Sequence, residues 1–429
     1  MYKINLSLLW FFITIIGFIS KQIIALDCRD YTDPLSYKST KVKCDIVKNE
    51  DYDKITANST EFLSPSEAFV IDFTCGSSDT TLCEKAKNAF ISAGQRIASV
   101  IRFNTPIRVN ASFAALSANT LGSAKPARTI PLQDQDGIIR LYPQALVKQM
   151  QFPSHPEFST YDITALFSST ADVFFKEDVT IQTNQYDFEY IVTHEYIHGL
   201  GFISYWREWF VPDFPDLTPY PEFLVDNTDP SKPITYTGFT ETAFDRYMVL
   251  NTTDKIKMTT LAQQINKFAP IGKKFPSLIS FEESFLDSRQ SYIAENLSYA
   301  AINPYSMDFV TNDSTPVILE TKIIPFNPGS SVTHVDTLYM NTSDFLMVYV
   351  AQPGITLDDI IIKNGNASGG AIGPYLTKVL ETLGYTTANN LSPYRPTLPK
   401  SGSNNISPSL SMAISLIITI TLSQYFNIF

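Results

Sequence analysis

The chain has little positive charge. It holds 32 Lys and Arg against 43 Asp and Glu, for a formal net charge of −11, and it has no run of basic residues. A protein that binds nucleic acid neutralises phosphates with a basic surface, so this balance argues against nucleic acid as a partner. The sequence also shows no internal repeat.

Both ends of the chain have the composition of sorting signals. Residues 1–25 carry a lysine, the apolar run Leu6–Ile19 and a small residue before Leu26, which predicts a secretory signal peptide. Residues 391–405 form a Pro/Ser/Asn linker, and residues 406–429 end in the apolar tail Leu410–Phe429. No basic residue follows that tail, which favours a GPI-anchor signal, the alternative being a true C-terminal membrane anchor. Either way we expect an extracellular protein on the cell surface or in the wall, bound to the membrane through its C-terminus.

Asparagine sequons agree with export. Nine Asn-x-Ser/Thr sites lie in the mature chain and predict glycosylation at several of them: Asn58, Asn110, Asn251, Asn296, Asn312, Asn341, Asn366, Asn390 and Asn405.

Cysteine is scarce. The four cysteines are Cys28, Cys44, Cys75 and Cys83, and their even number in an exported chain predicts two disulfides. Three pairings are possible, of which Cys75–Cys83 is the easiest local one. The alternative is a thiol that caps a metal ion in a latent form of the protein.

The mature chain divides into a short N-terminal part and one large domain. Residues 26–80 are polar and form either an N-terminal disulfide-containing lobe or a removable prosegment; the sequence leaves both open. Residues 81–390 read as a catalytic domain with an insertion at 205–330. Apolar spacing predicts helices over Leu82–Ile101 and Phe188–Leu200, strands over Pro106–Phe113 and Asp172–Lys176, and helical pieces near Phe244–Leu250 and Thr259–Lys267. This order predicts an α+β fold.

Histidine is also scarce, and two of the four histidines lie in His194-Glu195-Tyr196-Ile197-His198. Residues i and i+4 share one face of a helix, so both imidazoles can reach one zinc ion. Glu195 is offset around the helix and can act on a metal-bound water as general base. Glycines at 199 and 201 end the helix where a third ligand has to arrive.

The third ligand must come from a distant segment. In the compact HExxHxxGxxH motif it would stand at the position of Ser204. His334 is the better of the two remaining histidines, because Met347 follows thirteen residues later and can pack as a soft side chain beneath the metal. His155 has no such methionine. A surface histidine is the alternative for His334, and Asp336 is a metal-site neighbour of an imidazole, a substitute ligand or a turn residue.

These segments resemble a known family. The stretches His194–Phe202 (HEYIHGLGF), Phe244–Tyr247, Gly329–Asp336 (GSSVTHVD) and Phe345–Met347, taken in order, resemble secreted metzincin-related zinc metallopeptidases of the leishmanolysin-like type. Landmarks within Pro106–Pro126 and at Leu383–Tyr385 extend the resemblance over about residues 82–386. It departs from the family at Val335 and at Val348-Tyr349.

The resemblance implies a metzincin-like zincin fold. In such a fold an N-terminal mixed sheet carries the active-site helix, and a C-terminal subdomain carries the third ligand and the Met-turn. It implies zinc as cofactor, His194, His198 and His334 as ligands, Glu195 as general base and Met347 as the Met-turn. In related families a tyrosine two residues after that methionine stabilises an oxyanion, which makes Tyr349 a catalytic candidate; a packed aromatic core residue is the alternative.

The function expected from this site is hydrolysis of peptide bonds in extracellular polypeptides by zinc-activated water. One alternative is a catalytically inactive metallopeptidase-like glycoprotein with a role in adhesion or wall structure. Another is a zinc enzyme that hydrolyses a non-peptide amide. Asp245 and Arg246 are expected to pair structurally and to have no catalytic role.

Overall fold

The computed structural model of the chain describes residues 26–48, 62–117, 120–210, 215–226, 229 and 231–399. The predicted signal peptide and the tail at 406–429 lie outside these residues, as do residues 400–405 of the linker. Within the described part, no helix combines the length and apolar character needed to cross a membrane.

The main sheet has four strands in the order β4-β6-β11-β7. β4 (Phe69–Cys75), β6 (Ile107–Ala114) and β11 (Ile163–Ser168) are parallel, and β7 (Gly122–Pro126) runs antiparallel to β11 at one edge. The predicted strand at 106–113 is confirmed as β6, whose alternate residues Ile107, Val109, Ala111 and Phe113 are buried. Since β4 lies within residues 26–80, that part of the N-terminal segment is integral to the sheet.

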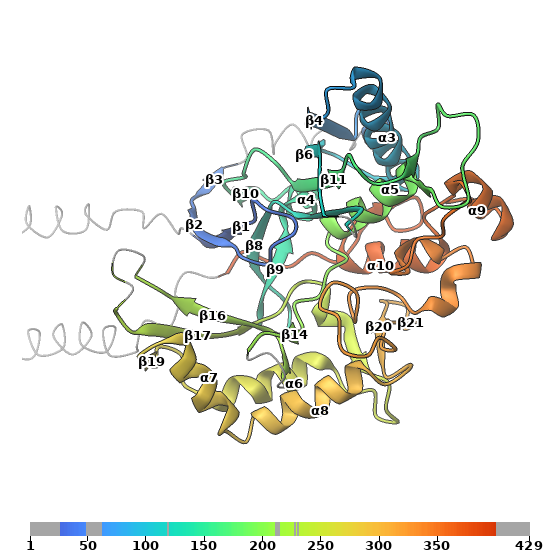
Figure 1. Ribbon diagram of the computed structural model, residues 1–429. Coiled ribbons are helices and arrows are strands. Elements are labelled where there is room, and N and C mark those ends of the chain that lie inside the picture. The colour runs from blue at the N-terminus through green and yellow to red at the C-terminus, as the bar shows by residue number, and fades with distance from the viewer. Residues whose placement is uncertain are drawn as a thin grey trace, which may run out of the picture.

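Two helices cover this sheet and pack against each other (Figure 1). α3 (Thr80–Ala98) begins at Asp79, whose side chain accepts hydrogen bonds from two backbone amides of the first turn. α5 (Phe188–Gly199) carries the His-Glu motif and is buried almost throughout, as its apolar sequence requires. A Cβ on Gly199 would lie 2.7 Å from the Ile163 side chain, so glycine lets α5 approach β11 closely. Both predicted helices are confirmed, with ends shifted by a few residues.

A second sheet has the order β2-β1-β8-β9. β1 (Leu26–Asp30) and β2 (Thr40–Cys44) form a hairpin, and β8 (Arg128–Gln133), β9 (Ile139–Pro143) and α4 (Gln144–Gln149) complete this lobe. Cys28–Cys44 joins the two hairpin strands, and Cys75–Cys83 joins β4 to α3. All four cysteines are therefore paired, and none is left to cap a metal.

The insertion forms a layer of its own, below the two sheets in the view of Figure 1. Its elements are β14 (Arg207–Glu208), β15 (Leu217–Thr218), β16 (Tyr220–Leu224), β17 (Ile234–Thr240), α6 (Met258–Ile265), η2 (Asn266–Phe268), β19 (Lys274–Phe275), α7 (Leu278–Leu286) and α8 (Ser291–Ala301). Aromatic rings fill its core: Phe210, Phe223, Tyr236, Phe239, Phe268, Phe275, Phe281 and Phe285.

One predicted helix in the insertion is wrong. Residues 244–250 form a short 3-10 helix, η1 (Asp245–Tyr247), followed by strand β18 (Met248–Leu250). β18 pairs with β20 (Met307–Val310), which also pairs with β21 (Pro316–Ile318). Pairing with strands far along the chain therefore overrides the local helical spacing. The helix predicted at 259–267 is confirmed as α6 and η2.

The C-terminal part of the chain packs back against the N-terminal half. After η3 (Thr337–Asn341), η4 (Phe345–Met347), α9 (Leu357–Lys363) and α10 (Pro374–Leu383), β22 (Thr386–Thr387) pairs with β5 (Ile101–Arg102). Short pairs join β3 (Ile46–Lys48) to β10 (Ser154–Pro156), and β12 (Val173–Phe174) to β13 (Tyr186–Asp187). The fold is α+β, as the order of elements predicted.

Candidate metal centre

The structure brings three of the predicted site residues together. His194 and His198 lie on one face of α5, and His334 reaches them from the loop between β21 and η3. The Nε2 atom of His334 is 3.0 Å from that of His194 and 3.2 Å from that of His198. All three side chains are buried, with 9%, 7% and 5% exposure for His194, His198 and His334.

Each imidazole is oriented by a backbone carbonyl. Nδ1 donates to the carbonyl oxygen of Leu346 at 2.6 Å in His194, of Phe202 at 2.7 Å in His198 and of Ser330 at 3.1 Å in His334. A carbonyl oxygen only accepts, so this pattern assigns the ring proton to Nδ1 in all three residues. The three Nε2 lone pairs therefore point at one another.

The electrostatics of the three imidazoles favour the neutral form. Burial lowers the pKa of His194 to about 4 and that of His198 to about 3, and it lowers the pKa of His334 well below its ordinary value. Neutral imidazole is the form that ligates a metal. Lone pairs this close repel one another unless a cation lies between them. In a tetrahedral zinc site with Zn–N bonds of about 2.0–2.1 Å the nitrogens are about 3.3 Å apart, so these residues fit a zinc ion.

Glu195 lies between α5 and the edge strand β7. Its Oε2 accepts a hydrogen bond from the backbone amide of Ala124 at 2.8 Å. Burial raises the pKa of Glu195 to about 8, and the Ala124 amide and the Lys125 ammonium offset part of that rise. The side chain is half-buried, so it is held at a fixed position while keeping access to the site.

The segment around Met347 forms one side of the centre. Met347 is buried in η4, next to Leu346, whose carbonyl holds His194. The amide of Val335 donates to the carbonyl oxygen of Met347 at 2.9 Å, which ties the third histidine's segment to η4. η4 also packs against α5, where Tyr190 stacks on Phe345. Two segments far apart in sequence thus meet at the centre, as the spacing of His334 and Met347 led us to expect.

The loop that carries His334 is conformationally strained. Val332 has a φ of +55°, which is unfavourable for a β-branched residue. Its amide donates to the carbonyl oxygen of Glu320 at 2.8 Å, and the amide of Glu320 donates to the carbonyl oxygen of His334 at 2.9 Å. These two bonds hold the loop in the conformation that turns His334 toward α5.

Other candidates lie elsewhere or have different partners. Asp336 caps η3 and pairs with Lys322 at 2.6 Å, so it is a turn residue and no ligand. His155 lies in β10, stacked on Phe158. Tyr349 is 38% exposed, so the alternative of a packed core residue is wrong; its catalytic role stays a prediction.

The prediction that Asp245 and Arg246 pair with each other is wrong. Asp245 accepts hydrogen bonds from the amides of Thr242 and Tyr205, and Arg246 pairs with Asp134 at 2.7 Å. Asp245 thereby anchors the chain just after the histidine helix.

Comparison with known proteins identifies the family. Residues 28–411 match the family described as SPBPB7E8-like, which covers most of the chain. The chain belongs to the SPBPB7E8-like family. A relative of this protein in fission yeast (Schizosaccharomyces pombe), described as uncharacterized protein PB7E8.01, is 26% identical over 384 residues. The match covers 81% of the present chain and 66% of the relative, so the chain spans just under two thirds of that protein's length. No solved structure matches.

Several residues near the metal centre of this SPBPB7E8-like chain belong to no recognisable motif, so the sequence analysis did not identify them. Lys125 is next in sequence to Ala124, whose amide donates to Glu195, and its positive charge lowers the pKa of the Glu195 carboxyl. Tyr37 and Arg207 lie in contact with each other beside Lys125. Tyr37 is one of 22 tyrosines, and Arg207 belongs to a two-residue strand, so neither stands out before the fold brings them together.

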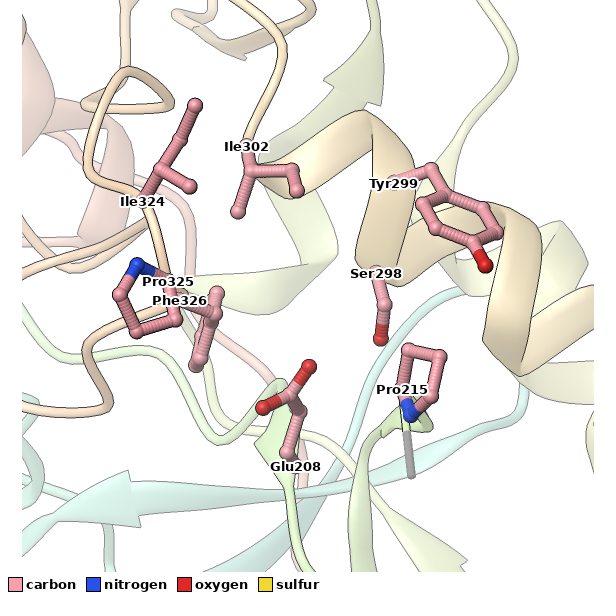
Figure 2. Close-up of a pocket in the computed structure, with 8 residues that line it drawn as sticks. All are labelled: Glu208, Pro215, Ser298, Tyr299, Ile302, Ile324, Pro325 and Phe326. Carbon is pink, nitrogen blue, oxygen red and sulfur yellow. The ribbon is translucent and has the colours of Figure 1, made fainter. Parts of the chain in front are cut away.

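A cavity of about 250 Å³ lies away from the histidines, between α8 and the segment at 324–326. Figure 2 shows the Glu208 carboxyl in this cavity, near Ser298 and Phe326. Successive side chains of a strand point to opposite faces, so Glu208 faces this cavity while its neighbour Arg207 faces Tyr37. The cavity is separate from the metal centre.

Proposed function

We propose that the protein is a zinc-dependent endopeptidase that acts on polypeptides outside the cell. One observation carries the proposal: three neutral imidazoles converge through Nε2 on one point, and the carboxyl of Glu195 projects from the same helix. Three protein ligands with an open fourth position are the arrangement of catalytic zinc sites, whereas structural zinc sites have four protein ligands.

Within this proposal each residue has a distinct task. Bound zinc supplies the Lewis acid that lowers the pKa of water and polarises a carbonyl. His194, His198 and His334 hold it, each kept in the correct tautomer by its backbone carbonyl. Glu195 accepts the proton of the attacking water through the oxygen not bound to Ala124, and then passes it to the leaving amine.

The arrangement around the site supports a metzincin-like fold of the leishmanolysin-like type. The sheet of parallel strands has one antiparallel strand, β7, at its edge, and β7 packs against the histidine helix α5. The third histidine and the buried Met347 come from a distant segment that closes the site. We therefore include a metzincin-like fold of this type in the proposal.

An extracellular location fits the surface of the molecule. Five predicted sequons have exposed asparagines, at Asn251, Asn296, Asn312, Asn341 and Asn366. Asn58 and Asn405 lie outside the described residues. The proposal therefore includes export and glycosylation, together with the C-terminal lipid anchor that the sequence predicts outside the described residues.

The test uses the protein purified from its source cells and a matched pair of variants. We expect the natural protein to hold one zinc ion and to cleave a mixed peptide library. Glu195→Gln keeps the zinc and lowers kcat/KM by about 10²–10⁴-fold, because the general base is lost. His155→Ala, far from the centre, keeps both zinc and activity.

Three outcomes would overturn the proposal. Full activity in Glu195→Gln protein would remove the mechanism. Zinc-loaded natural protein that cleaves no peptide would favour the inactive glycoprotein. Cleavage of a non-peptide amide alone would favour a zinc enzyme that hydrolyses such amides.

A further inference from the structure

The loop at residues 31–39, which joins β1 to β2, lies against the edge strand β7. Ser123 Oγ donates to the carbonyl oxygen of Pro34 at 2.9 Å, and Lys125 Nζ donates to that of Ser36 at 2.6 Å. At its far side the Tyr37 hydroxyl donates to the carbonyl oxygen of Pro328 at 3.1 Å. The loop therefore spans from β7 to the segment that carries His334.

The ring of Tyr37 is enclosed by two cations and an indole. The Arg207 guanidinium carbon lies 3.5 Å from the ring centroid, and Lys125 Nζ lies 4.5 Å from it. The Trp209 ring meets Tyr37 edge-on at 6.2 Å. We call Lys125, Arg207 and Trp209 the Tyr37 cradle. Cations over an aromatic face are attracted to its electron density, so the cradle has the chemistry of an aromatic receptor.

The cradle cations have few other partners. Lys125 is only 5% exposed, and its Nζ donates to the backbone carbonyl of Ser36 rather than to a carboxylate. Arg207 Nε and Nη1 are buried without a hydrogen-bond acceptor in the described chain. Burial and the neighbouring Arg207 lower the pKa of Lys125 to about 8, with Asp33 and Glu195 opposing. Two such cations side by side are stabilised by the aromatic ring between them.

Lys125 and Tyr37 each lie close in sequence or in space to a segment of the metal centre. Lys125 directly follows Ala124, whose amide holds Glu195. Burial raises the pKa of Tyr37, and the charge of Glu195 adds to that rise while Arg207 opposes it. Pro328 lies two residues before Ser330, whose carbonyl orients His334. A side chain in the cradle therefore lies beside the proposed catalytic groups.

We propose that the Tyr37 cradle is a subsite for an aromatic side chain of the substrate, and that Tyr37 fills it as an internal competitor. This inference rests on the proposed peptidase function. A substrate enters by displacing the loop, whose residues Asp33, Leu35 and Lys38 face solvent. The Cys28–Cys44 disulfide lies at the base of the hairpin and keeps the loop near the site when the ring leaves.

The first experiment compares two zinc-binding probes on the zinc-loaded protein, phenylalanine hydroxamate and acetohydroxamate. In Tyr37→Ala protein we expect the preference for the aromatic probe to rise roughly tenfold, since the two cation–π contacts and the one hydrogen bond of the Tyr37 side chain no longer compete. Protein with the Arg207→Gln substitution should show no preference for the aromatic probe. Leu35→Ala, on the same loop but facing solvent, should match the natural protein.

A second measurement separates this inference from the proposed function, because it needs neither zinc nor cleavage. Zinc-free Tyr37→Ala protein is titrated with N-acetylphenylalanine amide, with binding followed by tryptophan fluorescence from Trp206 and Trp209. We expect roughly tenfold tighter binding than in the natural protein and in Tyr37→Phe, which keeps the ring. Equal or weaker binding in Tyr37→Ala, or an undiminished aromatic preference in Arg207→Gln, would overturn the inference. Absent zinc or absent cleavage would instead count against the proposed function.

Discussion

The metal centre and the core of the insertion are built in opposite ways. At the metal centre three imidazoles are fixed by backbone carbonyls, and their lone pairs face one another at 3.0 and 3.2 Å. In the insertion, rings such as Phe281 and Phe285 pack edge-on against Phe268 and Phe275. The Lys273 ammonium lies over those same two rings, which is a favourable contact. The first arrangement is unfavourable without a ligand, and the second is favourable by itself.

This difference separates binding from stability. Burying polar groups that repel one another costs free energy, which a bound cation returns. Burying aromatic rings stabilises the fold directly. Substitutions in the metal centre should therefore change zinc binding far more than unfolding, and substitutions in the aromatic core should do the reverse.

The largest effect is expected from His334→Ala. Loss of a neighbour of a zinc ligand typically weakens binding by 10–100-fold, so loss of the ligand itself should weaken zinc binding by more than about 100-fold. Isothermal titration of zinc-free protein measures this. If the zinc-free variant unfolds at the same midpoint as the zinc-free natural protein, the metal centre serves binding and not stability. Unchanged zinc affinity would contradict the proposed difference between the two regions.

Phe281→Ala tests the other region. Phe281 is fully buried and contacts several rings, so its truncation should lower the free energy of unfolding by about 3–5 kcal/mol. Denaturant titration measures the loss, and the folded fraction should still bind zinc with natural affinity. A variant that unfolds normally but loses zinc would show that the two regions are coupled.

The pH dependence of the zinc-free protein gives a smaller signal at Glu195. Burial raises its pKa from the ordinary value to about 8, so between pH 4.5 and 8 the folded state binds a proton that the unfolded state releases. Stability attributable to this group is present at low pH and is lost as the pH rises. Glu195→Gln protein should therefore gain stability relative to the natural protein over that range, as thermal unfolding at several pH values would record. If the difference in stability between the two proteins does not change with pH, the Glu195 carboxyl is solvated and its pKa is not raised.

The smallest effect is expected from Tyr349→Phe. A donor in a water-excluded site contributes about 10²–10³-fold to kcat, and an exposed donor contributes less. Tyr349 is 38% exposed near the centre's methionine segment, so we expect Tyr349→Phe to lower kcat by about tenfold, with KM and zinc content unchanged. Steady-state kinetics decides the point. No change in kcat would leave Tyr349 without a catalytic role.

Much of the histidine helix could be read from the sequence. The i, i+4 spacing of His194 and His198 and the glycines after them are local features, and local features predict helices well. The third ligand required a different inference, from His334 and Met347 as a pair. The structure brings His334 to the helix, although the spacing alone gave no information on the path between them.

Other parts could not be read because they depend on distant partners. β18 carries helical spacing but pairs with β20, so its sequence was misleading. Tyr37, Lys125 and Arg207 are ordinary surface types in sequence, and only the packing of the β1–β2 loop against β7 brings them together. Glu195's partner, the Ala124 amide, is a backbone group and leaves no mark on composition.

X-ray absorption at the zinc edge of the purified natural protein tests the central claim most directly. The account predicts one zinc ion per chain with three imidazole nitrogens at about 2.0–2.1 Å and one oxygen ligand. Protein that holds no zinc after equilibration with the metal, or zinc with sulfur ligands or fewer than three imidazoles, would contradict it.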